Sequence, residues 1–148
     1  MKIKRTVLLI LIALTVCLIW GQSCLPVAVS QKESQLVKDH VVQPIQEKLT
    51  GKKTVTFDVR KTAHTVEYVP LGLELILLLL LRERRLNALL SALSVSGLTA
   101  LLDESIQILS GRGPMISDVW LDIAGAVIGM AVGGAVLWIV SVIKKKRG

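Results

Sequence analysis

The chain has 148 residues, of which 52% are hydrophobic and 20% are charged. This composition argues against a disordered tail and against an ordinary soluble domain, because a surface that faces water needs more charge. The 18 Lys and Arg residues outnumber the 11 Asp and Glu residues and give a formal net charge of +7. An excess of basic residues is typical of proteins that bind nucleic acid and of proteins at an anionic membrane surface. The positions of the charges distinguish the two classes.

The apolar residues gather into four long runs, at about residues 7–25, 64–81, 86–109 and 119–143. Each run approaches the roughly 20 residues that a helix needs to cross the hydrocarbon core of a bilayer. We therefore predict a single-domain, all-α integral membrane protein, a bundle of four transmembrane helices. The basic residues ahead of the first run also suit a signal peptide. No convincing small-x-small cleavage site follows that run, so we interpret it as an uncleaved anchor.

The polar segment between the first two runs, about residues 26–63, is predicted to be an extracytoplasmic loop. Five apolar residues in it recur at helical spacing: Leu36, Val37, Val41, Ile45 and Leu49. This pattern is typical of an amphipathic helix on the membrane surface, and we expect Pro44 to kink it. Residues 54–59 alternate polar and apolar side chains and are expected to be extended.

The basic residues predict the orientation of the chain. Three clusters lie before the first run, between the second and third runs, and after the fourth, and together they hold ten Lys and Arg residues with one acid, Glu83. Residues 30–61 instead mix seven basic residues with four acids. Because cytoplasmic loops carry an excess of Lys and Arg, we expect both termini in the cytoplasm. The expected partners are then membrane lipids and not nucleic acid.

Ionisable residues also occur inside the apolar runs, although a charge at mid-membrane costs about 2.5 to 3.5 kcal/mol. At about 1.5 Å of rise per residue, those of the last three runs fall at one extracytoplasmic level and share helix faces. We therefore expect one buried polar site that opens outward. Its predicted members are His64, Glu67, Tyr68, Asp103, Glu104, Gln107, Arg112, Asp118 and Asp122.

Two further features concern the packing between helices. Gly125, Gly129 and Gly133 follow one another at four-residue spacing, which removes side-chain bulk where another helix has to approach and would bring Asp122 close to its partners. Glu74 lies deeper on the second predicted helix. We expect its carboxyl group to bond to Ser96 or Thr99.

Several motifs occur together between about residues 60 and 133. They are Lys61-Thr-Ala-His64-Thr-Val-Glu67-Tyr68-x-x-Leu71-Gly72, Asp103-Glu104-x-x-Gln107, Arg112, and Asp118-x-x-x-Asp122-x-x-Gly125 with Gly129. In this combination the chain resembles the VanZ-like family, although Asp122 stands where Asn is common and residues 20–23 match the family only loosely. The resemblance implies a small bacterial integral membrane protein. The family is named for a member associated with low-level resistance to the glycopeptide teicoplanin, and the resemblance implies no established reaction.

The chemistry of the predicted site has alternatives. His64 and Glu67, one turn apart, are candidates for a general base and its orienting carboxylate, and Glu104 is a second candidate base. The alternative is an interfacial histidine that only hydrogen-bonds the acid. Ligand binding is expected for the other members, with helix-to-helix bonding, neutralisation by Arg112 and the helix dipole at Asp118 as structural alternatives. We predict no metal, because no second histidine is within reach.

Two classes of function follow. In the first, the outer site engages a membrane lipid, a lipid-linked cell-wall precursor or a glycopeptide antibiotic, and contributes to teicoplanin resistance or envelope maintenance without chemistry. In the second, the protein is a membrane hydrolase or transferase that acts on an extracytoplasmic lipid headgroup. A proton-coupled transporter has less support, because no broken-helix inverted repeat is visible. No Ser-His-Asp set, phosphate-binding loop or Cys/His zinc motif occurs, and no cofactor is expected.

Overall fold

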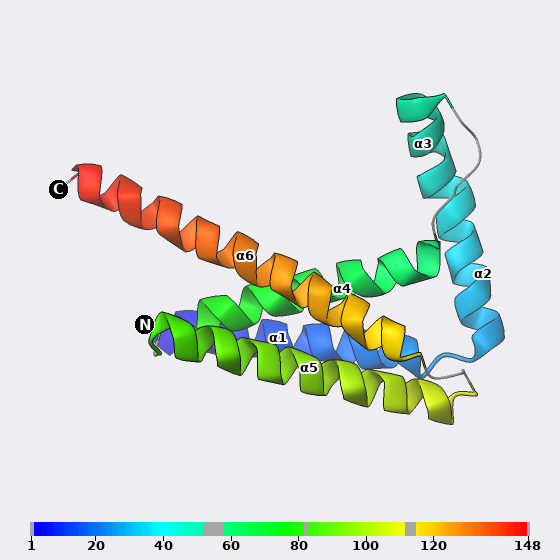
Figure 1. The fold of residues 1–148 in the computed structure, drawn as a ribbon, viewed down its shortest axis with the longest axis horizontal. Coiled ribbons are helices and arrows are strands. Elements are labelled where there is room, and N and C mark those ends of the chain that lie inside the picture. Colours follow the sequence, from blue (N-terminus) through cyan, green and yellow to red (C-terminus); the bar gives the residue numbers. More distant parts are fainter. Residues whose placement is uncertain (1, 52–57, 82, 112–114, 148) are drawn as a thin grey trace.

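The computed structural model describes residues 2–51, 58–81, 83–111 and 115–147, and every regular element among them is helical. Four long helices run along a bundle (Figure 1): α1 (Lys2–Ser23), α4 (Val59–Leu79), α5 (Arg85–Leu109) and α6 (Ile116–Arg147). Three shorter elements stand across one end of it: α2 (Val27–Val37), the π-helical turn η1 (Lys38–Val42) and α3 (Gln43–Thr50). The predicted all-α architecture is confirmed.

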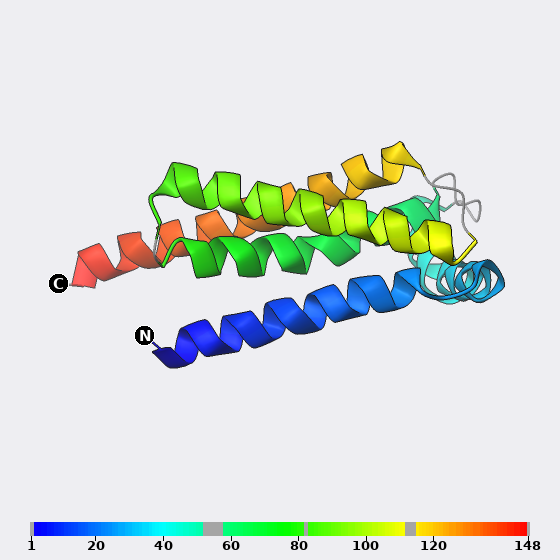
Figure 2. The same cartoon turned by 90° about the horizontal axis from the view of Figure 1, so that it is seen from below.

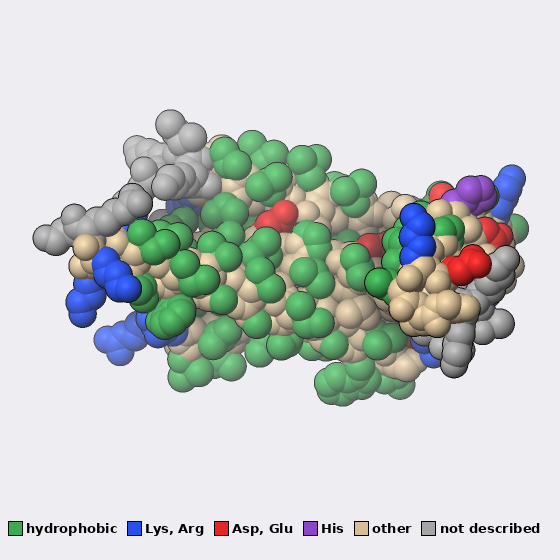
Figure 3. Space-filling model, turned by 90° about the horizontal axis from the view of Figure 1, so that it is seen from above, with side chains coloured by type: hydrophobic (Ala, Val, Ile, Leu, Met, Phe, Trp, Pro, Cys, Tyr) green, Lys and Arg blue, Asp and Glu red, His purple; other side chains and the backbone are tan. Residues whose placement is uncertain are grey.

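Each long helix contains a segment that is long and apolar enough to cross a membrane, namely Arg5–Ser23, Val59–Leu79, Arg85–Leu109 and Ile116–Lys146. At most 33% of the residues in the most apolar part of each segment are buried within the protein, so most of the apolar side chains face outward. In Figure 3 they cover the middle of the molecule, and charged side chains gather toward its two ends. An apolar surface of this size is stable in contact with lipid chains but not in contact with water. The chain is therefore a multi-pass membrane protein.

The second membrane helix starts earlier than predicted. The carboxylate of Asp58 accepts hydrogen bonds from the backbone N–H groups of Arg60 at 3.0 Å and Lys61 at 3.4 Å. This cap satisfies donors that the first turn of a helix leaves open, and it starts α4 at Val59. Asp58 has the extended backbone predicted for residues 54–59, but the prediction is wrong at Val59. Residues 54–57 lie outside the described part of the chain.

The segment between Val27 and Thr50 is helical, as predicted, with a π-helical turn in place of a sharp kink; its place on the membrane surface stays a prediction. Pro44 lies in the first turn of α3 and has no N–H to donate. Just before it, the N–H of Gln43 bonds to the carbonyl of Lys38, five residues back. The chain thus accommodates the proline by a local change of hydrogen-bond register. The five apolar residues of this helix are all exposed, which leaves an apolar face for lipid.

The packing of α4 against α6 depends on glycines. A Cβ atom added at Gly125 would overlap the carbonyl of Thr65, one at Gly129 would overlap that of Val69, and one at Gly72 would overlap the carbonyl of Ala126. Only glycine allows two helix backbones to approach so closely. The predicted role of the glycine series is confirmed. It brings Asp122, one turn before Gly125, against α4.

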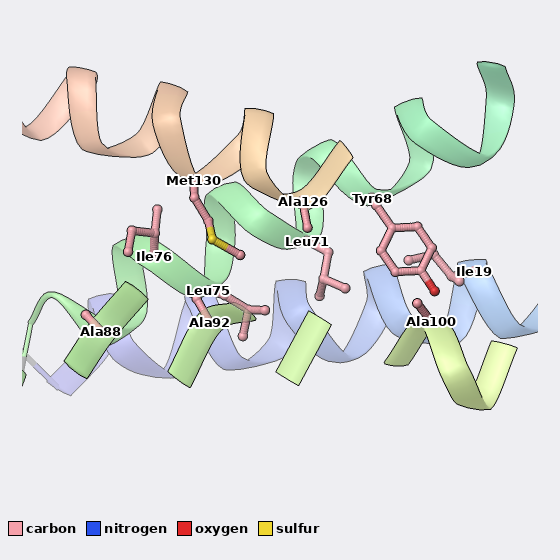
Figure 4. Packing of buried hydrophobic residues seen from close by; sticks show 10 residues of the cluster. All are labelled: Ile19, Tyr68, Leu71, Leu75, Ile76, Ala88, Ala92, Ala100, Ala126 and Met130. Carbon is pink, nitrogen blue, oxygen red and sulfur yellow. The ribbon is translucent and has the colours of Figure 1, made fainter. Parts of the chain in front are cut away.

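The apolar core lies between the long helices (Figure 4) and includes residues from all of them: Ile19, Tyr68, Leu71, Leu75, Ile76, Ala88, Ala92, Ala100, Ala126 and Met130. Helix α1 packs along α4 and α5, as Figure 2 shows. Small side chains on α5 keep that helix close to its neighbours. The core therefore holds the four long helices in one bundle.

Both termini and the connection from α4 to α5 lie at one end of the bundle (Figure 1), whereas α2, α3 and the connection from α5 to α6 lie at the other. The three segments with basic clusters consequently share one end, as predicted. That this end faces the cytoplasm stays a prediction.

Candidate functional site

A buried polar cluster forms between α4, α5 and α6, toward the end of the bundle that carries α2 and α3. The polar cluster consists of His64, Tyr68, Asp103, Gln107 and Asp122, none of which is more than 7% exposed. Residues four apart on a helix share a face, and this spacing relates the two members on α4 and also the two on α5. The sequence prediction that these side chains meet is confirmed for these five residues.

Gln107 is the centre of the hydrogen bonds in the polar cluster. Its Nε2 donates to Oδ2 of Asp103 at 3.0 Å and to Oγ of Ser23 at 3.4 Å. Its Oε1 accepts a hydrogen bond from Nη2 of Arg60 at 3.1 Å. One amide therefore links the ends of α1, α4 and α5, and it fixes the carboxylate of Asp103 from one side.

His64 is paired with an acid from another helix. Its Nδ1 lies 3.5 Å from Oδ1 of Asp122, and this contact crosses from α4 to α6. Spacing along the second predicted helix pointed instead to Glu67 as the carboxylate that orients His64. Glu67 is half-buried and lines the neighbouring groove. The close approach at Gly125, one turn from Asp122, is what makes the contact between helices possible.

The polar cluster contains atoms with unused hydrogen-bonding capacity. Four of its side chains have buried atoms without a hydrogen-bond partner among the described residues: Nδ1 of His64, the hydroxyl of Tyr68, Oδ1 of Asp103 and both carboxylate oxygens of Asp122. Buried polar groups are nearly always paired, and an unpaired one costs about 1–3 kcal/mol. Helix packing alone gives no reason for such an arrangement, and the atoms are available to a ligand or to buried water.

A groove of about 370 Å³ opens beside the polar cluster, between the end of α1, the helix α2 and the start of α4. Its polar lining includes Ser23, Glu33, Ser34, Arg60, His64 and Glu67, and its apolar lining includes Leu36, Val37, Val59 and Ala63. His64 belongs to both the groove and the polar cluster. A ligand in the groove can therefore reach the cluster through this residue.

Glu104 and Asp118 are buried at the junction of α5 and α6. Oε2 of Glu104 accepts a hydrogen bond from the backbone N–H of Met115 at 3.1 Å, and Oδ1 of Asp118 accepts one from Oγ of Ser117 at 3.1 Å. The first contact holds the start of α6 against α5, and the second lies within the first turn of α6. Arg112, which the sequence also placed in the site, lies outside the described residues.

Sequence reasoning missed Arg60 and Ser23. Arg60 lies four residues before His64 and hence on the same face of α4, so the same spacing argument could have found it. Ser23 is 2% exposed at the last residue of α1. No sequence signal indicated it, because its contact with Gln107 depends on where α1 packs.

The prediction for Glu74 names the wrong partner. Oγ1 of Thr15 on α1 donates to the two carboxylate oxygens of Glu74, at 3.0 and 3.2 Å. The hydroxyl of Thr99 bonds within its own helix, to the carbonyl of Val95, and Oγ of Ser96 has no partner in the part of the chain that the structure describes. The prediction compared only α4 and α5. The packing of α1 beside α4 supplied a different partner.

Comparison with known proteins places the chain in a family. No curated protein and no solved structure matches it. A family model described as VanZ/LLP1 matches residues 6–140, a range that includes the whole polar cluster and parts of all four long helices. The chain therefore belongs to the VanZ/LLP1 family.

Proposed function

We propose that this protein binds a lipid or a lipid-linked envelope precursor of the bacterial cell membrane, at the extracytoplasmic headgroup level. Through this binding it contributes to envelope maintenance or to low-level teicoplanin resistance. The observation that carries the proposal is the polar cluster itself, which is buried, has unpaired polar atoms and adjoins the groove through His64.

The lining of the groove supports a headgroup as the ligand. Nε of Arg60 is buried without a hydrogen-bond partner among the described residues, and a guanidinium group binds phosphate or carboxylate oxygens through its N–H groups. The apolar side chains of Leu36 and Val37 lie on the α2 side of the same groove. A molecule with an anionic head and an apolar body would match both surfaces.

The surface helix supports a location at the membrane interface. Val41, Ile45 and Leu49 expose between 49% and 79% of their surface, and Lys48 lies among them on the same helix. Helices of this kind lie in the interface with the apolar face toward the acyl chains. α2, which continues this helix, borders the groove, and so the groove lies at headgroup level.

The test is native mass spectrometry of the protein extracted from its own membrane. We expect an anionic lipid to remain bound to the wild type, and the bound fraction to fall about tenfold in Arg60→Gln, which corresponds to about 1.4 kcal/mol. Arg85→Gln, an exposed arginine at the other end of the bundle, is the matched control and should retain the lipid. A wild type without bound lipid, or equal losses in the two variants, would contradict the proposal.

The contact between His64 and Asp122 favours a second candidate, a hydrolase or transferase that acts on the headgroup. A carboxylate beside an imidazole can orient it as a general base. Teicoplanin susceptibility and the mass spectrum of the envelope lipids separate the two functions in His64→Asn. An enzyme predicts that the lipid spectrum changes together with susceptibility. A binding protein predicts that susceptibility changes and the lipid spectrum does not.

A further inference from the structure

We propose that the polar cluster binds a divalent transition-metal ion, such as Zn²⁺ or Mn²⁺, through His64, Asp103 and Asp122. The sequence predicted no metal because no second histidine is within reach of His64. The fold instead brings one carboxylate from α5 and one from α6 to the imidazole on α4. This inference concerns the metal alone, and it does not depend on which lipid the groove accepts.

The three side chains lie close enough together to converge on one metal ion. Each of the three residues offers one ligand atom, and these atoms lie within 4.8 Å of one another. Nδ1 of His64 and Oδ1 of Asp122 are 3.5 Å apart, which exceeds the roughly 2.7–3.2 Å of an N–H···O hydrogen bond. Two ligands on a tetrahedral Zn²⁺, with bonds of about 2.0–2.1 Å, are separated by about 3.3 Å.

A second observation comes from buried atoms of the polar cluster that have no hydrogen-bond partner among the described residues. The hydroxyl of Tyr68 is completely buried and has no hydrogen-bond partner among the described residues. The Tyr68 side chain points from α4 toward α5 in Figure 4. Both oxygens of Asp122 are likewise unpaired within the described residues. A bound cation with its water would supply partners to these atoms.

A divalent ion would also allow both buried acids to be ionised. Asp103 and Asp122 are at most 1% exposed, and two ionised carboxylates are stable in such a place only if positive charge accompanies them. Arg60, the described arginine beside the cluster, donates to the amide of Gln107. A divalent ion would balance both acids and leave the imidazole neutral, which is the form that binds metals.

The donor atoms select the kind of ion. An imidazole nitrogen suits Zn²⁺ and carboxylate oxygens suit Mn²⁺, so a mixed set of one imidazole and two carboxylates favours these ions over Mg²⁺ and Ca²⁺, which prefer oxygen ligands alone. The hydrogen bond from Gln107 to Oδ2 of Asp103 orients that carboxylate and leaves Oδ1 for the metal. Three protein ligands leave a coordination position open. Because His64 borders the groove, an anionic oxygen from the groove could occupy that position.

The test measures metal uptake by the full-length protein in detergent, without added lipid. The protein is stripped with a chelator, incubated with Zn²⁺, Mn²⁺ or Mg²⁺, passed through a desalting column and analysed by mass spectrometry of the elements. We expect close to one Zn²⁺ or Mn²⁺ per chain and no retained Mg²⁺. Asp122→Asn and His64→Gln should weaken the affinity at least about tenfold. Glu74→Gln, which changes an acid deeper on α4 that bonds to Thr15 and lies outside the three ligands, should keep it.

A variant that fails to fold would also lose metal, so a second measurement uses the wild type. X-ray absorption of the Zn²⁺-loaded protein should show nitrogen and oxygen ligands, with imidazole scattering and no sulfur. Sulfur ligands would implicate the exposed Cys17 or Cys24 and overturn the proposal. Wild-type uptake at background level, or unchanged uptake in Asp122→Asn, would overturn it as well. Lipid retention is measured separately, so either proposal can fail while the other stands.

Discussion

The two halves of the bundle bury different kinds of side chain between the same helices. The half near α2 encloses polar side chains such as His64, Asp103 and Asp122, whereas the other half encloses Ile76 and Met130. Interhelical hydrogen bonds in membranes contribute only about 0.6 kcal/mol on average. Helix packing is therefore a sufficient reason for burying the apolar side chains of one half. It is a poor reason for burying the polar side chains of the other half. We therefore propose that the apolar half contributes mainly to stability and the polar half mainly to function.

The largest effect is expected where the backbones of α4 and α6 touch. In Gly129→Ala the new Cβ overlaps the carbonyl of Val69 and approaches the backbone nitrogen of Leu73, so we expect a loss of about 3 kcal/mol or failure to fold. Gly134→Ala has no atom within 4 Å of its added Cβ and should behave as wild type. Gel filtration and thermal unfolding in detergent measure both variants. Equal stability of the two variants would mean that this contact does not hold α4 and α6 together.

A smaller loss is expected in the apolar half. Ile76→Ala removes a side chain that is 1% exposed, and we expect it to reduce the free energy of unfolding by about 2–4 kcal/mol through cavity formation. Lipid retention per folded molecule should stay at the wild-type level. Unfolding in a denaturing detergent gives the first quantity, and native mass spectrometry gives the second. Loss of lipid without loss of stability would contradict the division between the halves.

The opposite pattern is expected in the polar half. With a chelator present, Asp122→Asn should change the free energy of unfolding by less than about 1 kcal/mol, because the amide oxygen of Asn keeps an acceptor beside Nδ1 of His64 while the substitution removes a buried charge. The same variant should lose metal uptake and resistance. As for Ile76→Ala, unfolding in a denaturing detergent gives the stability and native mass spectrometry gives the lipid retention. Susceptibility to teicoplanin is measured in addition. A stability loss as large as that of Ile76→Ala would assign Asp122 a structural role.

The smallest effect is expected at the boundary between the halves. A double-mutant cycle of Thr15→Val with Glu74→Gln should give a coupling of about 0.6 kcal/mol, the average for such bonds in membranes. Thr99→Val removes a hydroxyl that bonds within its own helix, and it should show no coupling to Glu74. Coupling to Thr99 in place of Thr15 would restore the sequence prediction and contradict the packing of α1.

The sequence predicted the architecture well because the bilayer imposes it. The four apolar runs form four helices, with ends a few residues from those predicted, and at the start of α4 the Asp58 cap accounts for the difference. Helical spacing also predicted correctly which side chains of one helix share a face. It did not reveal that His64 is paired with Asp122, because that contact depends on the rotation and depth of two helices.

The sequence by itself determined a membrane bundle of four helices, a surface helix at one end and the closeness of α4 to α6 at the glycines. These features follow from local hydrophobicity and from the absence of a side chain, so they can be read along the chain. Only the tertiary structure decided that Gln107 joins Arg60 and Ser23, that Glu74 bonds to Thr15, and that His64 is paired with Asp122 and not with Glu67. Such contacts join residues far apart in sequence, and they exist only once the helices have packed at a particular angle and depth.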